Sequence, residues 1–195
     1  VPVQPRGHHW RPTGSGTIIW IEALDGGDPT REVEHRDRVM MLEAPFTGRA
    51  KQVTILENRF SKIYWGETRN TALVREYDSS RNWYYTWLVD PDNPDIDDRL
   101  LWSHSVNERY EHPGFPLMRQ LPNGKRAMRV HSNSIFLNGN GSSVEGDRPF
   151  LDKLNLVKFE RERLFKCDED SYEAVVALLS DDGSEYVTRH ETEDE

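Results

Sequence analysis

Short runs of apolar and β-branched residues, separated by turn-forming residues, recur along the whole chain. The first round has such runs at residues 17–21, 38–42 and 52–56, with turn-rich links at 12–16 and 44–48. Runs of this length, bounded by Gly, Pro, Asn, Asp or Ser, are typical of β-strands. The pattern therefore predicts an all-β chain of short antiparallel strands.

The same succession of strands then starts again. Further strands are predicted at 62–66, 71–77, 82–89 and 99–103, then at 116–121, 126–130, 150–156 and 162–166, and finally at 173–179 and 185–189. The strand at 126–130 either continues through 134–137 or gives way to a loop. The second strands of successive rounds centre near Ile19, Leu73, Met128 and Val187, at intervals of about 54 to 59 residues, and a four-stranded repeat of this order indicates propeller blades.

The predicted fold is thus an all-β partial β-propeller of about three and a half four-stranded antiparallel blades, which form an open arc. The chain is taken as a single region, 1–195, with blades near 1–58, 59–105, 106–168 and an incomplete 169–195. A β-sandwich also has short strands at regular spacing, and the internal period is what favours the propeller.

Composition and charge exclude several classes of protein. The net charge is −9 and no dense cluster of Lys and Arg occurs, which argues against a nucleic-acid partner. No apolar run approaches the roughly 18 residues of a membrane helix, so no membrane partner is predicted. The single cysteine, Cys167, excludes an internal disulfide. The compartment stays open among cytoplasm, periplasm and chloroplast stroma.

Sequence motifs for catalysis are missing from the chain. No Gly-x-Ser-x-Gly nucleophile elbow, Walker loop or Gly-x-Gly-x-x-Gly motif occurs, so no catalytic residue is assigned. The seven histidines are scattered apart from His8 and His9, which would point to opposite faces of a strand. We therefore predict neither a metal site nor a cofactor, and expect the acidic run 191–195 to be solvated.

Two polar loops each place an arginine among acidic residues. Arg109 lies in the segment 108–114, and Arg148 lies in the segment 145–150. Each arginine could form a salt bridge within its blade and so order its loop. Alternatively, each could face a cavity and bind a carboxylate through two parallel hydrogen bonds.

Several stretches together resemble a known family of peptidases. They are Trp20 to Pro29, Phe60 to Gly66, Glu76 to Asp78, Glu108 to Gly114 and Gly146 to Asp152. In this order they are similar to the amino-terminal propeller of glutamyl endopeptidases, which belong to the prolyl oligopeptidase family of serine peptidases. The resemblance spans most of the chain.

The resemblance implies a propeller that caps the active site of an α/β-hydrolase domain, which this chain does not contain. It implies that the propeller limits access to peptides, and that cleavage follows glutamate. Arg109 and Arg148 are the candidate residues for binding the glutamate side chain. The partners expected are the hydrolase domain of the same parent chain and a peptide substrate.

Three hypotheses for function follow. The first is a non-catalytic, substrate-gating propeller segment of a serine peptidase. The second is a non-catalytic propeller scaffold for protein–protein interaction, which would be followed by further blades and no hydrolase domain. The third is a free-standing all-β binding domain, which would fold cooperatively by itself.

Overall fold

The chain folds almost entirely into β-strands. A computed structural model describes residues 1–14 and 16–191, and no helix occurs among them. Ser15 of the first turn-rich link, and residues 192–195 of the predicted acidic run, lie outside the described residues. The all-β class predicted from the apolar runs is confirmed.

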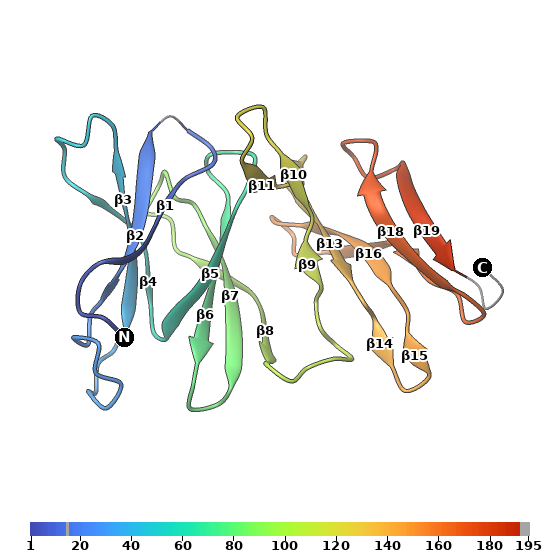
Figure 1. Cartoon of the computed structure of the whole chain (residues 1–195), viewed down its shortest axis with the longest axis horizontal. Helices are drawn as coiled ribbons and strands as arrows, with labels where there is room; N and C mark the ends of the chain where they lie inside the picture. Colours follow the sequence, from blue (N-terminus) through green and yellow to red (C-terminus); the bar gives the residue numbers. More distant parts are fainter. Residues whose placement is uncertain (15, 192–195) are drawn as a thin grey trace. The chain divides into compact units, whose positions relative to one another are not determined.

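The first two sheets have the same topology. The first contains β1 (Arg6–Trp10), β2 (Thr17–Ala23), β3 (Asp37–Glu43) and β4 (Lys51–Leu56), and the second contains β5 (Arg59–Trp65), β6 (Ala72–Asp78), β7 (Trp83–Val89) and β8 (Arg99–Ser105). In each sheet the strands pair in chain order and antiparallel (Figure 1). A four-stranded antiparallel meander of this kind is the blade of a β-propeller.

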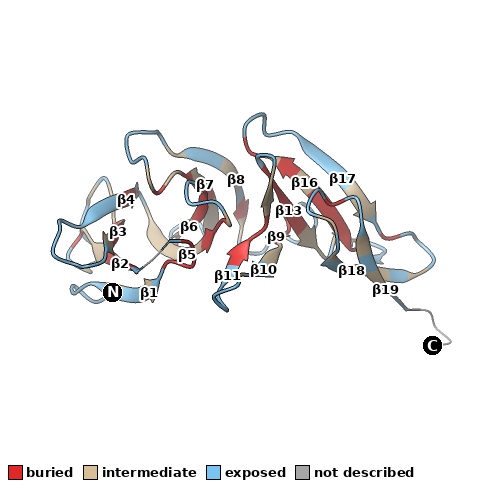
Figure 2. Cartoon of the chain, turned by 90° about the horizontal axis from the view of Figure 1, so that it is seen from above, coloured by how far each residue is buried: buried red, intermediate tan, exposed pale blue. Residues whose placement is uncertain are grey.

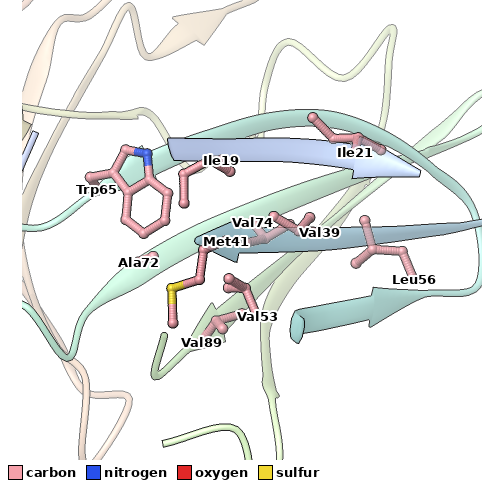
Figure 3. Close-up of a cluster of buried hydrophobic side chains, with 10 residues drawn as sticks. All are labelled: Ile19, Ile21, Val39, Met41, Val53, Leu56, Trp65, Ala72, Val74 and Val89. Atoms are coloured by element: carbon pink, nitrogen blue, oxygen red, sulfur yellow. The ribbon is translucent and has the colours of Figure 1, made fainter. Parts of the chain in front are cut away.

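Alternating side chains of these two sheets form one apolar core (Figure 3). Ile19 and Ile21, two residues apart on β2, point to the same face and are at most 2% exposed. They meet Trp65 and Val74 of the second sheet in the same buried cluster. Burial of each such aliphatic side chain contributes about 1.5–3 kcal/mol, which holds the two blades face to face.

The third sheet has an edge strand made of two separate pieces. Its strands are β9 (Phe115–Pro116), β12 (Val130–His131), β13 (Ser134–Gly139), β16 (Phe150–Asn155) and β17 (Arg161–Lys166). Both β9 and β12 pair with β13, one at each end of it. Between them the chain forms an inserted hairpin of β10 (Met118–Gln120) and β11 (Arg126–Met128). The central strands β13 and β16 are largely buried, whereas β17 is mostly exposed (Figure 2).

The prediction that the second strand of the third round centres near Met128 is wrong, because that strand is β13. Ser132 and Asn133 both have positive φ, 47° and 60°, and form a two-residue turn that pairs His131 with Ser134. Two successive residues with positive φ are the mark of a type I′ hairpin turn. The turn at 122–125 therefore belongs to the inserted hairpin, and the segment 126–137 is not one continuous strand.

Two further hairpins complete the described chain. A small one, β14 (Ser142–Ser143) and β15 (Gly146–Asp147), extends the connection between β13 and β16 (Figure 1). The other, β18 (Tyr172–Leu178) and β19 (Tyr186–Glu191), has half the strands of a blade. Two full blades, a third with a divided edge strand and a half blade match the predicted count of about three and a half.

The chain divides into two compact units, which are described separately. One contains residues 1–106 and 120–127, and thus the first two sheets and the tip of the inserted hairpin. The other contains residues 107–119 and the chain from Met128 onward, and thus the third sheet and the last hairpin.

Each unit contains a buried arginine that joins one sheet to a loop of the next. Arg11, which follows β1, is 1% exposed and donates to the carbonyl oxygen of Arg69 in the link between β5 and β6. Its guanidinium lies 5.2 Å from the ring centroid of Trp65. Arg129, which precedes β12, donates to the carbonyl oxygen of Ser180 at 2.7 Å in the link between β18 and β19. These arginines satisfy loop carbonyl groups that a blade alone would leave unpaired.

Candidate functional site: a cationic groove on the third sheet

A hollow of about 350 Å³ beside the third sheet has four cations among its lining residues. Arg148, Arg161, Arg163 and Lys166 line it, together with the single acidic side chain of Glu111. A smaller hollow of about 170 Å³ shares the wall formed by residues 112 and 141–142, and it is lined by Arg109 and Phe115. We call the two hollows together the cationic groove.

A β-bulge brings the three cations of β17 to one face. Between β16 and β17 the register shifts, so that Asp152 pairs with Arg163 while Leu151 pairs with Phe165. Leu164 is the extra residue, and beyond it the alternation of sides is reversed. Lys166 therefore pairs with Phe150 and lies on the same face as Arg161 and Arg163.

One buried carboxylate fixes two of these cations. The side chain of Asp152 is fully buried. Its two oxygens accept hydrogen bonds from Arg163, and one of them also forms an ion pair with Arg161. Both guanidinium groups also lie over the Phe150 ring, at 5.4 Å and 4.5 Å from its centroid. Cation–π contact and a shared carboxylate together restrict the rotamers of both arginines. The base of the groove is thus ordered before any ligand enters.

Arg148 is held at the rim of the groove by its backbone. Its amide donates to the carbonyl oxygen of Gly141 at 3.0 Å. Gly141 has φ of 59°, and a Cβ there would lie 2.0 Å from the carbonyl oxygen of Arg148. Only glycine permits this approach. The side chain of Arg148 forms no ion pair within the part of the chain that the structure describes.

Arg109 lies on a loop ordered by the residue before it. The carboxylate of Glu108 accepts the amides of Tyr110 and Glu111 at 2.8 Å and 2.9 Å. Arg109 itself is exposed and has no ion-pair partner among the described residues. The salt bridges within a blade that the sequence allowed for Arg109 and Arg148 are therefore not formed there. The structure brings both arginines to adjoining hollows, and their role in substrate binding stays a prediction.

Arg161, Arg163 and Lys166 were not predicted from the sequence as site residues. The strand was predicted at 162–166, so the i, i+2 spacing that places Arg161 and Arg163 on one face appears only once the strand begins at Arg161. For Lys166 no such signal exists, since regular alternation would put it on the opposite face. Its position depends on the bulge, which no turn residue marks.

Other site types are not found in the described residues. No group of three or more His, Cys, Asp or Glu side chains there could hold a metal ion. The described chain also has no helix long and apolar enough to cross a membrane. The groove is the feature with the clearest chemistry, because arginine and lysine side chains gather in it.

The fold and the groove define a segment of a β-propeller with a cluster of cations on its third sheet. No protein-family model matches the chain. Two curated proteins are similar to it over 90% of its length: probable chloroplastic glutamyl endopeptidases from Oryza sativa subsp. japonica, at 34% identity, and from Arabidopsis thaliana, at 33%. The chain spans only about a fifth of each of them, 20% and 19% respectively.

Solved structures with some similarity include the propeller domain of a protease and the protein TolB. The β-propeller domain of the Trilobed protease from Pyrococcus furiosus is 14% identical with a TM-score of 0.47, and the match covers 86% of this chain and 45% of that one. TolB from Acinetobacter baumannii is 14% identical with a TM-score of 0.44, and covers 89% of this chain and 36% of its own.

Proposed function

We propose that the chain is a non-catalytic propeller segment of a serine peptidase of the prolyl oligopeptidase family, and that it limits which peptides reach the active site. The observation that carries the proposal is the similarity to probable glutamyl endopeptidases at 33–34% identity over 90% of the chain. The blade topology is compatible with it, since stacked blades form a rigid ring around a narrow passage. The partner in this proposal is an α/β-hydrolase domain of the same protein.

Arg109 and Arg148 are proposed to bind the glutamate side chain of the peptide. They line adjoining hollows, and within the described residues neither is neutralised by an ion pair. An arginine can hold a carboxylate through two parallel hydrogen bonds between opposite charges. A glutamine side chain is neutral, so it forms no such charge pair with the arginine. The proposal therefore predicts selectivity for glutamate over glutamine.

The test of the peptidase assignment uses the full-length protein that the gene encodes. It is expected to react with a fluorophosphonate probe and to cleave a glutamate-containing peptide faster than its glutamine counterpart. A full-length protein that has further blades and no serine reactive toward the probe would overturn the assignment and leave the scaffold function.

The test of the two arginines uses Arg109→Gln and Arg148→Gln in the full-length protein. We expect KM for glutamate peptides to rise and KM for glutamine peptides to stay unchanged. Arg49→Gln removes an exposed charge that lines neither hollow and serves as the control. If both groove variants only lower the melting temperature and leave KM unchanged, the binding role is excluded.

A further inference from the structure

The cationic groove contrasts with the rest of the chain, which is acidic overall. The net charge is −9, yet four cations and one acidic side chain line the larger hollow. Even with Asp152 counted beneath two of the arginines, the site carries a positive excess. Such a local reversal of sign concentrates anions at one place on the surface.

The excess charge belongs to the two cations that Asp152 does not reach. Arg148 and Lys166 line the hollow, and neither forms an ion pair among the described residues. Arg161 and Arg163 in turn are already ordered by Asp152 and Phe150. An arriving anion would therefore meet two cations without a direct ion pair, and only Arg161 and Arg163 beside them are ordered in advance.

The shape of the groove favours a chain over a single small anion. The two hollows adjoin through Gly141 and its neighbours, and the second adds Arg109 as a further cation. Tyr110 and Phe115, 63% and 51% exposed, provide apolar contact beside the cations. Charged groups spaced along a groove with aromatic side chains suit an extended polypeptide with several acidic side chains.

The surroundings of the groove disfavour a nucleic acid. A third hollow shares Arg148 and Lys166 with the first, and its wall includes Glu145, Asp168 and Glu169. A phosphate backbone carries charge continuously along its length and would meet these carboxylates. A peptide can place its carboxylates at the cations and neutral residues elsewhere.

We propose that the cationic groove docks an acidic stretch of polypeptide through at least two carboxylates, one held by Arg148 and Lys166 and another by Arg109. Asp152 is a positioning residue, because it fixes Arg161 and Arg163 at the base of the groove. The inference deepens the proposed function and rests on it for its setting, since it extends recognition from one glutamate to two or more acidic residues with neutral residues between them. The binding itself needs no cleavage.

The experiment measures binding of a fluorescent peptide with four glutamates by fluorescence anisotropy, using the full-length protein at about 4 °C. Mass spectrometry of the recovered peptide establishes that it is intact. The expected result is binding of the glutamate peptide, about tenfold weaker binding of a peptide with glutamine in place of glutamate, and weakening as ionic strength rises.

The decisive variant is the double substitution Arg148→Gln with Lys166→Gln, for which we expect Kd to rise about tenfold or more. The matched control is Lys158→Gln with Arg189→Gln, which removes two exposed charges on the same unit outside the groove. Equal Kd values for the groove variant and the control would overturn the proposal.

Two further outcomes are informative about the ligand. Competition by inorganic phosphate at the same molar concentration as the peptide would assign the groove to a small anion and overturn the peptide proposal. Retained peptide binding in a protein that lacks peptidase activity would support the docking site and contradict only the proposed function.

Discussion

At the scale of single residues, Asp152 is an acidic side chain in the third sheet whose burial has to be compensated. It is fully buried, and its partners Arg161 and Arg163 are 37% and 44% exposed. A carboxylate in such a place is tolerated because two cations compensate its desolvation. Its removal would leave two guanidinium groups close together over one aromatic ring.

The first prediction concerns the substitution Asp152→Asn. We expect the free energy of unfolding to fall by about 2–4 kcal/mol. This is less than for a fully buried ion pair, because both arginines are partly exposed. Urea unfolding measures the change. Asp147→Asn, at an exposed position of β15, is the control and should stay within about 0.5 kcal/mol of the wild type. Equal effects of the two substitutions would contradict the structural role of Asp152.

Glu76 is a buried acid of the opposite kind, because no arginine of the described residues forms an ion pair with it. It is 1% exposed, and it accepts hydrogen bonds from the indole of Trp87 at 2.8 Å and the amide of Asn58 at 2.7 Å. Burial raises the pKa of Glu76 above the usual 4.5, more than the two hydrogen bonds lower it. The folded chain therefore holds a proton at a pH where the unfolded chain has lost it.

The second prediction follows from the sign of this shift. As pH rises from about 4.5 through the raised pKa of Glu76, the folded chain binds more protons than the unfolded chain, so its stability falls. Glu76→Gln should flatten this decline in the free energy of unfolding. Denaturant unfolding from about pH 4 to 8 measures both slopes. Asp98, whose pKa burial also raises, stays in the variant and leaves a smaller slope. Identical slopes for both proteins would refute the assignment.

At the scale of elements, the turn between β12 and β13 determines the register of these two strands in the third sheet. Ser132 and Asn133 both adopt positive φ, and asparagine tolerates this conformation far better than serine does. The turn fixes the pairing of Val130 with Ile135, which places the apolar residues of β13 in the buried layer. Ser132 is thus the strained residue of an otherwise favourable hairpin.

The third prediction uses this strain. Ser132→Gly should raise the free energy of unfolding by about 0.5–1 kcal/mol, because glycine adopts positive φ without steric cost. The control is Ser134→Gly, two residues further along in extended β13, which should lower it. Melting temperatures measured by circular dichroism distinguish the two. A loss of stability in Ser132→Gly would contradict the turn.

The same elements show how far the sequence alone could predict the fold and the site. Most strands of the first two blades follow from runs of apolar residues that turn residues separate. The exception is β1 (Arg6–Trp10), which was not predicted because its sequence RGHHW is not an apolar run. In the third blade the turn at 132–133 contains neither glycine nor proline, so the strand boundary stayed open. Arg109 and Arg148 could be selected from their loops, whereas Lys166 reaches the groove only through the bulge at Leu164.

At the scale of the whole molecule, the contacts between sheets depend on a few buried cations. The side chain of Arg11 is fully buried and lies 2.7 Å from the carboxylate of Asp92, which Arg69 also contacts at 3.2 Å. Burial alone would raise the pKa of Asp92, but Arg11 and Arg69 hold it below its usual 3.8. Two sheets are thus joined by one charge network as well as by their apolar core.

The fourth prediction tests this network. Arg11→Met keeps much of the apolar volume but leaves Asp92 with Arg69 alone, and we expect a loss of about 2–4 kcal/mol in the free energy of unfolding. Arg49→Met, at an exposed position, is the control. Urea unfolding followed by tryptophan fluorescence measures both. An unfolding curve for Arg11→Met that matches the control would show that the apolar core alone joins the blades.

In the divided edge strand of the third sheet, the register with β13 does not depend on how many residues lie between the two pieces. β9 and β12 pair with β13 as successive parts of one strand, although residues 117–129 intervene in the chain. The amide of Arg129 donates to the carbonyl oxygen of Leu117 at 2.9 Å and closes the base of the inserted hairpin. A change in the length of the hairpin beyond that closure would leave the pairing of β13 intact, but it would disturb the contact of the hairpin tip, where Asn123 donates to the carbonyl oxygen of Pro12 at 3.0 Å. The length of the insertion is therefore limited by what its tip contacts and not by the register of β13.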